Sequence, residues 1–233
     1  MAFSPISETV ISLTLLFFAY VFSITSTGVL QAYVARLMGD STADDVGLSE
    51  FNPFLHINPL SLIFFLLINF MAGQSIPIDV RNIKRSWYPL RLFWAFGSRS
   101  IFYLLFSVIS WVASLAICGP ITHMGEVIFP VSTQMLAEHY TQTSSTTMLI
   151  CLFLGLMTFA NVLLAVFSAI QEAVYCFVMV KFDKDVAFIS YAEPILIFAP
   201  LVVIYFFGNA IFGVFLYGVS SVVMKLAPLL GVL

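Results

Sequence analysis

The chain has 233 residues, of which 61% are hydrophobic, 16% aromatic and only 9% charged, and its mean hydropathy is +1.05. Soluble domains carry about 25% charged residues, so this composition excludes an ordinary soluble protein. The formal net charge of −3 includes no basic run, which argues against nucleic acid as a partner. A membrane-spanning helix needs about 20 mostly apolar residues. Residues 1–233 are therefore expected to form a single integral membrane domain in the lipid bilayer.

About five apolar segments are long enough to be considered as spans, at approximately 10–38, 60–78, 101–118, 148–169 and 194–223. The first ten residues contain no Lys or Arg, so the first segment is expected to be a retained span and not a cleaved signal peptide. The second segment is short, and we interpret it as a short span or a partly re-entrant one. The fourth is expected to bend after residue 169 or to continue along the interface.

Loop charges predict an orientation, because Lys and Arg are enriched on the cytoplasmic side. With about five spans, the loops 74–100 and 181–192 lie on one side, opposite the loop 39–59. Those two loops hold seven basic residues and the other side holds Arg36 and Lys225. We therefore expect a cytoplasmic amino terminus.

A run of Gly, Asp and Asn-Pro residues joins the first two apolar segments. It reads Gly39-Asp40-Ser41-Thr42-Ala43, then Gly47, then Asn52-Pro53-Phe54-Leu55-His56-Ile57-Asn58-Pro59. This run resembles the compact branch of the site-2 protease family of intramembrane zinc metallopeptidases, in which G-D-x-T-A-x-x-x-G-x-x-x-x-N-P-x-x-H-I-D-P follows the catalytic helix. Every position of that pattern matches except the Asp, which is Asn58 here.

Two later stretches extend the resemblance over about residues 20–180. The sequence from Ser75 to Lys84, SIPIDVRNIK, resembles P-V-P-V-N-P-R-N-x-R, and the sequence from Asn161 to Phe167, NVLLAVF, resembles N-L-x-L-A-x-F. The resemblance implies an all-α polytopic transmembrane helix bundle with a site-2 protease-like core, commonest in the bacterial inner membrane. It also implies structural roles for the motif residues Gly39, Asp40, Asn52, Pro53, His56, Pro59, Pro77 and Asn161.

The catalytic positions depart from the family. The family places H-E-x-x-H on the first helix, where two His side chains hold zinc and the Glu activates the bound water. At that spacing this chain has Thr27, Gly28 and Gln31, and the third ligand position falls on or near Cys176. Thr and Gln are feeble zinc ligands, so the resemblance implies a catalytically inactive homologue that has no metal and no other cofactor.

The remaining Cys and His residues suggest no replacement site. The cysteines Cys118, Cys151 and Cys176 lie in apolar stretches without CxxC spacing and are expected to be small buried apolar residues. The resemblance gives His56 no zinc-binding role, and a His between Asn-Pro turns is expected to satisfy backbone carbonyls. No phosphate-binding G-x-x-x-x-G-K-[ST] motif occurs, so no nucleotide partner is expected.

Two features of the fourth segment concern packing. Asn161, Ala165 and Ala169 form a stripe of small residues at i, i+4 and i+8, typical of close helix packing within a bundle or against a partner chain. Glu172 has two interpretations: an interfacial residue, if the span ends near Ala169, or a functional ionisable residue inside the membrane.

Three functions follow. The first is a non-catalytic structural or partner-binding subunit of a membrane complex, with other transmembrane proteins as partners. The second is a small-molecule or lipid binding protein, or a permease component, that uses the cavity vacated by the metal. The third is an active peptidase with an unorthodox site.

Overall fold

The computed structural model of the protein describes residues 5–118, 145–182, 213–214, 217–218, 221–226 and 228. Within these residues the named helices are α1 (Pro5–Met38), α2 (Thr42–Asp45), α3 (Pro53–His56), α4 (Pro59–Ile68), α5 (Tyr88–Cys118) and α8 (Ser145–Phe182). This part of the chain is all-α, with one isolated antiparallel bridge between Ile57 and Gly73. The expected span at 194–223 lies mostly outside the described residues.

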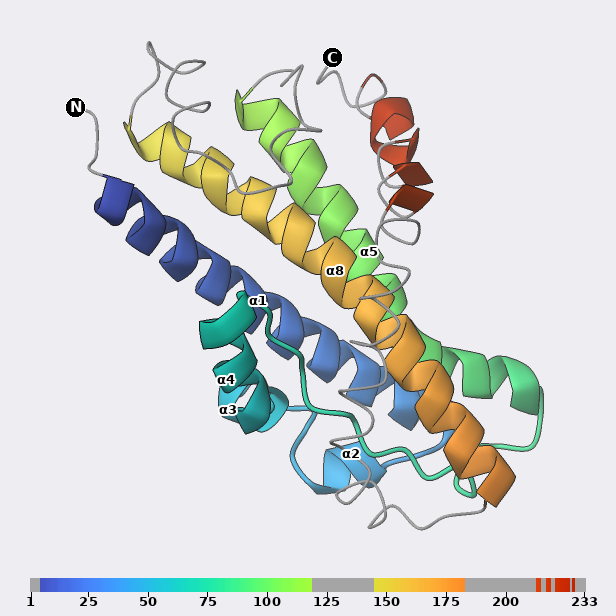
Figure 1. Ribbon diagram of the computed structural model, residues 1–233. Coiled ribbons are helices and arrows are strands. Elements are labelled where there is room, and N and C mark those ends of the chain that lie inside the picture. Colours follow the sequence, from blue (N-terminus) through green and yellow to red (C-terminus); the bar gives the residue numbers. More distant parts are fainter. Residues whose placement is uncertain are drawn as a thin grey trace.

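Three helices are long and apolar enough to cross a membrane, over Thr9–Met38, Tyr88–Ile117 and Leu149–Lys181. They lie side by side in Figure 1, and α1 and α8 run in the same direction while α5 runs against them. The composition had predicted an integral membrane protein, and these three helices support that prediction. The coarser part of the expected fold, an all-helical chain with helices that could span a membrane, is therefore confirmed for the described residues.

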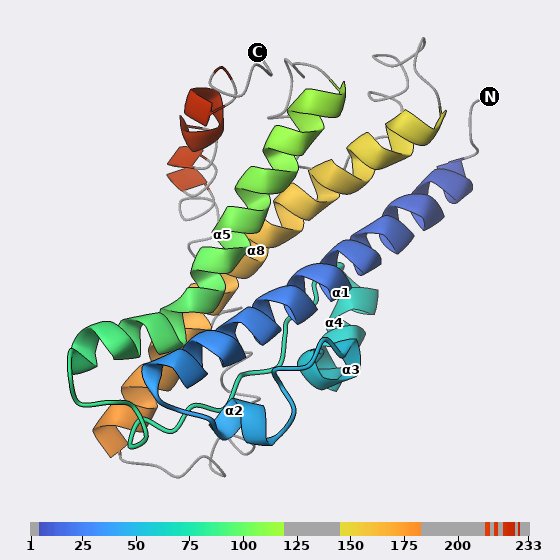
Figure 2. The ribbon, with the colours of Figure 1, turned by 180° about the vertical axis from the view of Figure 1, so that it is seen from behind.

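The second apolar segment does not form a long helix. Helix α4 has 10 residues, which at about 1.5 Å per residue gives roughly 15 Å, half of a hydrocarbon core about 30 Å thick. It ends at Asn69, whose left-handed backbone (φ 56°) terminates the helix. The chain then returns as an extended segment to the start of α5 at Tyr88 (Figure 2). The alternative that residues 60–78 form a short span is therefore wrong, and the interpretation of this segment as re-entrant fits the structure.

Two apolar clusters hold the helices together. One joins Leu16, Tyr20 and Ile24 of α1 to α4, α5 and α8. The other joins the end of α1, at Ala32 and Ala35, to the first turns of α5, the end of α8 and the extended segment 76–83. Because each cluster contains residues from all three long helices, the bundle is packed along most of its described length.

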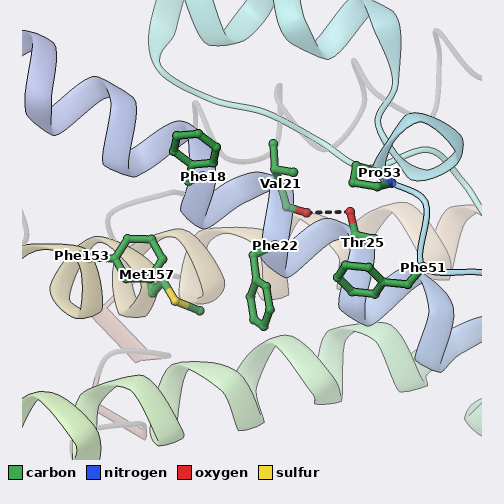
Figure 3. Close-up of a pocket in the computed structure, with 8 residues that line it drawn as sticks. All are labelled: Phe18, Val21, Phe22, Thr25, Phe51, Pro53, Phe153 and Met157. Carbon is green, nitrogen blue, oxygen red and sulfur yellow. Dashed lines mark hydrogen bonds between the residues drawn. The ribbon is translucent and has the colours of Figure 1, made fainter. Parts of the chain in front are cut away.

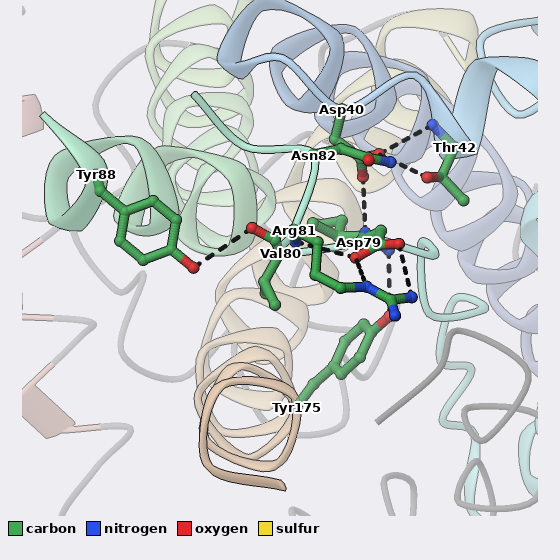
Figure 4. A network of polar contacts seen from close by, with 9 residues as sticks. Asp40, Thr42, Asp79, Val80, Arg81, Asn82, Tyr88 and Tyr175 are labelled. Carbon is green, nitrogen blue, oxygen red and sulfur yellow. Dashed lines mark hydrogen bonds and ion pairs between the residues drawn. The ribbon is translucent and has the colours of Figure 1, made fainter. Parts of the chain in front are cut away.

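The motif residues after α1 form one polar network (Figure 4). Gly39 adopts a φ of +117°, and a Cβ there would lie 2.9 Å from Lys84 Cγ, so glycine is required. The buried Asp40 carboxylate accepts hydrogen bonds from Thr42, from the Asp79 backbone N–H at 2.8 Å and from Asn82 Nδ2 at 3.1 Å. Asp40 therefore connects the α1–α2 junction to the segment that leads to α5.

The two Asn-Pro pairs begin helices. The Asn52 side chain accepts a hydrogen bond from Phe54 N and starts α3, and the Asn58 side chain accepts one from Leu60 N and starts α4. In both helices Pro occupies the first turn, where its missing N–H costs nothing. Asp and Asn are equally good in the cap position, so Asn58 performs the local role of the Asp in the compared pattern.

The loop 39–59 and the segment 74–87 meet at the same end of the bundle. Lys84 N donates to Met38 O at 3.2 Å, and Asp79 N donates to the Asp40 side chain. The prediction that these two loops lie on opposite sides of the membrane is therefore wrong. Its physical cause is α4, which is too short to carry the chain across.

Helix α8 continues beyond the expected end at residue 169 and reaches Phe182 without interruption. Glu172 is 2% exposed and lies inside this helix, which favours the interpretation as an ionisable residue within the span over the interfacial one. Near the other end of α8, Cys151 is disulfide-bonded, whereas Cys176 is a free thiol. The expectation of three unbonded cysteines is wrong for Cys151.

We expect Asp40→Ala to destabilise the protein by about 2–4 kcal/mol, because it leaves several donors in a protein interior without their charged acceptor. Asp45→Ala is the matched control, since Asp45 is an exposed acidic residue on the neighbouring α2 and such changes cost about 0.5 kcal/mol or less. Thermal unfolding of both variants in the same detergent measures the difference. Equal melting temperatures would contradict the role of Asp40 as the connection.

Candidate functional site

The extended segment after α4 runs through the interior of the bundle. Four of its apolar residues are fully buried: Met71, Ala72, Ile76 and Ile78. The backbone N–H and C=O groups of this segment therefore lie in the interior, where the adjoining helices α5 and α8 provide hydrogen-bond partners. Arg99 Nη1 of α5 donates to Gln74 O at 2.7 Å. Irregular backbone at membrane depth is tolerated only where protein covers it, and α5 and α8 provide that cover here.

Helix α8 contributes two further contacts to the same segment. Gln171 Nε2 donates to Ser75 Oγ at 3.0 Å, and Tyr175 Oη accepts from Ile78 N at 3.1 Å. Gln171 and Tyr175 lie one helical turn apart and therefore share a face of α8. Polar residues in the second half of α8 thus serve the re-entrant segment and do not mark the end of the span.

A buried polar centre lies beside this segment, and we define it as Gln31, His56, Arg99 and Glu172. Each residue comes from a different helix, α1, α3, α5 and α8 respectively, and each is at most 2% exposed. Arg99 acts electrostatically on both Glu172 and His56, and Gln31 interacts with the Glu172 carboxylate. The fold therefore brings together four polar side chains that are far apart in the sequence.

The centre is incompletely hydrogen-bonded. Both carboxylate oxygens of Glu172, Nε and Nη2 of Arg99, Nδ1 of His56 and Oε1 of Gln31 are buried without a hydrogen-bond partner. A buried ionisable residue in a membrane span is costly and faces the bundle interior, paired with an opposite charge. The positive charge of Arg99 acts on Glu172 through space, without a direct ion pair between the two side chains. We therefore treat this centre as the candidate functional site.

His56 is packed directly against α1. A Cβ added to Gly28 would lie 2.4 Å from His56 Nδ1, so any side chain at position 28 displaces the imidazole. Burial lowers the pKa of His56, and the charge of Arg99 lowers it further, while a hydrogen bond to the Glu50 carbonyl acts in the opposite direction. The ring is accordingly neutral near pH 7, and His56 Nε2 contacts Glu50 O at 3.3 Å as the Asn-Pro context predicted.

The residues at the compared metal positions do not fit a zinc ion. Thr27 Oγ1 donates to Ser23 O within its own helix, and Gln31 Nε2 donates to the carbonyls of Ala95 and Phe96 at 3.3 Å. The half-buried Cys176 packs against the apolar cluster that contains Ala32. Among the described residues, no three His, Cys, Asp or Glu side chains gather as a metal site. Two of the compared positions are thus engaged in other hydrogen bonds and the third in apolar packing.

The small-residue stripe of α8 faces the bundle core. Asn161 and Ala165 are fully buried, and Asn161 Nδ2 donates to Met157 O at 2.8 Å. Ala165 packs in the cluster with Tyr20 and Tyr103, whereas Ala169 is only partly buried. The stripe therefore serves packing within this chain. Pro77, another motif residue, is half-buried in the extended segment.

Arg99 is the residue of the centre that the sequence analysis did not single out as a site. It was counted only among loop charges, because a basic residue near an apolar segment usually marks the edge of a span. A signal was available: Arg99 is followed by an apolar run to Cys118 and preceded by one from Leu90 to Gly97, interrupted only by Arg91. A cation inside a continuous apolar segment predicts a buried partner.

A separate cavity of about 400 Å³ opens between α1, α8 and the start of α3. Its lining side chains are Phe18, Val21, Phe22, Thr25, Phe51, Pro53, Phe153 and Met157 (Figure 3). The only hydroxyl, from Thr25, is already donated to Val21 O at 2.7 Å. The cavity therefore offers an apolar surface and no group suited to acid, base or nucleophilic chemistry.

No family model, curated protein or solved structure matched this chain in the three comparisons made.

We expect the double variant Arg99→Met/Glu172→Leu to be destabilised by less than the sum of its single variants, by about 1–3 kcal/mol, because the two charges are coupled. Glu172→Leu alone should cost about 3–5 kcal/mol, since it leaves the buried guanidinium uncompensated. Unfolding in mixed detergent micelles measures all three variants. Lys225→Met is the control for loss of an exposed cation. Strict additivity of the single variants would show that the charges do not interact.

Proposed function

We propose that this chain is a non-catalytic, site-2 protease-like membrane protein that serves as a structural or partner-binding subunit of a membrane complex. The partner is a transmembrane helix of another protein. The bacterial inner membrane is proposed as its location on the resemblance alone. The observation that carries the proposal is that His56 occupies the space beside Gly28, where the compared family has its catalytic Glu.

The neighbouring contacts support the non-catalytic part. Gln31 is held by two backbone carbonyls of α5, and Gly28 has no room for a side chain. In the compared family, metal ligands would link α1 to α8. Here Gln31 of α1 and Glu172 of α8 lie in the same polar centre, and Arg99 links α5 to the extended segment. These residues hold the long helices together, as expected of a structural protein, and they do not form a group that would activate a water molecule.

The apolar surface around α3 and α4 supports the partner-binding part. Phe54 is 89% exposed and Leu66 is 81% exposed, and five further large apolar side chains between residues 51 and 68 are exposed. This surface, which we call the α3–α4 face, adjoins the apolar cavity through Phe51 and Pro53. In lipid, helices associate through close packing and not through hydrophobic exclusion from water. A cavity beside exposed aromatic rings provides a surface against which a partner helix can pack.

The second candidate is binding of an apolar small molecule or lipid. The 400 Å³ cavity is within the size range of ligand sites, about 300–1,000 Å³. Its apolar lining fits a hydrocarbon ligand and disfavours passage of a polar solute, so a permease role has no support from this cavity. The residues at the compared metal positions give no support to the third function, an active peptidase with an unorthodox site.

We further propose that the amino terminus lies outside the cytoplasm, the reverse of the expectation from about five spans. The described residues contain three candidate spans and a re-entrant segment. Most described cations lie at the end where α1 stops, which the rule of cytoplasmic Lys and Arg makes the cytoplasmic end. They are Arg36, Arg81, Lys84, Arg85, Arg91 and Lys181. The disulfide-bonded Cys151 lies toward the opposite end, and disulfides persist in oxidising compartments.

Labelling with a membrane-impermeant maleimide checks this orientation in intact cells. In a Cys176→Ser background, Thr9→Cys should react in intact cells, whereas Asp45→Cys and Ser86→Cys should react only after permeabilisation. Asp45 and Ser86 report on the two sides of the re-entrant segment, so they should behave alike. Opposite behaviour of these two positions would show that the segment 60–78 crosses after all.

Photo-crosslinking in native membranes tests the partner. A photoreactive amino acid at Phe54 or Phe22 should give one defined adduct with a transmembrane protein, identified by mass spectrometry. Ile109 is the control, because it is an exposed apolar residue on α5, a helix that is not part of the α3–α4 face. Adducts with lipid alone at Phe54 and Phe22 would contradict the partner and favour the second candidate. Equal protein adducts at Ile109 would show non-specific proximity.

A further inference from the structure

The first turns of α5 lie across the end of the bundle before the helix turns into it, as both views show (Figures 1 and 2). The pair Gly97-Ser98 lies within α5, and such pairs commonly accompany helix bends. On one side of these turns, Ala95 and Phe96 are buried against α1 and α8. The other side carries exposed residues.

That free side carries aromatic and aliphatic residues together with cations. Trp87 is 76% exposed, and Leu90, Phe93 and Trp94 are also exposed. Lys84 and Arg85 are exposed just before the helix, and Arg91 is partly exposed within it. We call these residues the interfacial strip: Lys84, Arg85, Trp87, Leu90, Arg91, Phe93 and Trp94.

The cations of the strip lack carboxylate partners among the described residues. The ion pairs found there are Arg36 with Asp44 and Arg81 with Asp79. The Arg81 guanidinium lowers the pKa of Asp79, so that pair remains charged and internally neutralised. Arg91 Nε is hydrogen-bonded only to a backbone carbonyl, Ser86 O, at 2.7 Å. The strip therefore presents a local excess of positive charge beside exposed Trp rings.

We propose that the interfacial strip binds the phosphate-bearing headgroups of anionic phospholipids in the leaflet at this end of the bundle. Trp rings favour the headgroup level, and a helix lying in the interface with basic and apolar residues binds anionic lipid through both. Charge complementarity favours an anionic headgroup, because the three cations of the strip have no carboxylate partner among the described residues. This inference requires only that α5 spans a membrane and does not rest on the proposed partner.

The test uses the purified full chain in lipid nanodiscs, with Trp94→Phe and Trp111→Phe so that Trp87 is the remaining fluorophore. Quenching of Trp87 by brominated phosphatidylglycerol is compared with quenching by brominated phosphatidylcholine, which gives the relative affinity for the two headgroups. We expect a severalfold preference for the anionic lipid that weakens as salt is raised. Each cation neutralised should reduce that preference by up to about fivefold.

Lys84→Gln/Arg85→Gln/Arg91→Gln removes the unpaired charges, and Arg36→Gln/Arg81→Gln is the control that removes paired cations at the same end. The first variant should lose the preference and the second should keep most of it. Equal quenching by both lipids in the protein that keeps all its cations, or equal loss of the preference in both variants, would overturn the proposal. Displacement by inorganic phosphate beyond the effect of matched chloride would also overturn it, by showing a site for a free anion.

Discussion

The backbone of the extended segment between α4 and α5 lies inside the bundle, and the rest of the structure is arranged around its hydrogen bonds. Arg99, Gln171 and Tyr175 each contact a different residue of this segment, and Asp40 accepts from its far end. Lipid cannot satisfy an exposed peptide group. Helices α5 and α8 therefore carry polar side chains at depths where an ordinary span would carry apolar ones.

The same constraint accounts for the buried polar centre. A guanidinium placed in the interior to reach Gln74 O leaves Nε and Nη2 without hydrogen-bond partners, and the acidic side chain on which its charge acts is Glu172. His56 fills the remaining space against Gly28.

The existence of the long helices could be predicted from the sequence, but their limits could not. Helix α5 begins at Tyr88 and not near residue 101, and α8 continues to Phe182 and not to 169. Both errors have one cause. The sequence analysis places residues 74–100 in a loop and ends the fourth segment at 169, since an unpaired charge is unfavourable in lipid. Arg99 and Gln171 instead find partners in the extended segment, 25 and 96 residues away along the chain, and the sequence pattern does not say which residues these partners are.

The sequence by itself predicted an integral membrane protein whose first apolar segment is a span, because hydropathy is a local property. It also showed that the compared zinc positions hold Thr27, Gln31 and Cys176. Only the tertiary structure decided that α4 turns back, that the loops on its two sides meet, and that Arg99, Glu172, Gln31 and His56 share one site. These are contacts between distant segments, and they depend on which buried polar groups find one another when the helices pack.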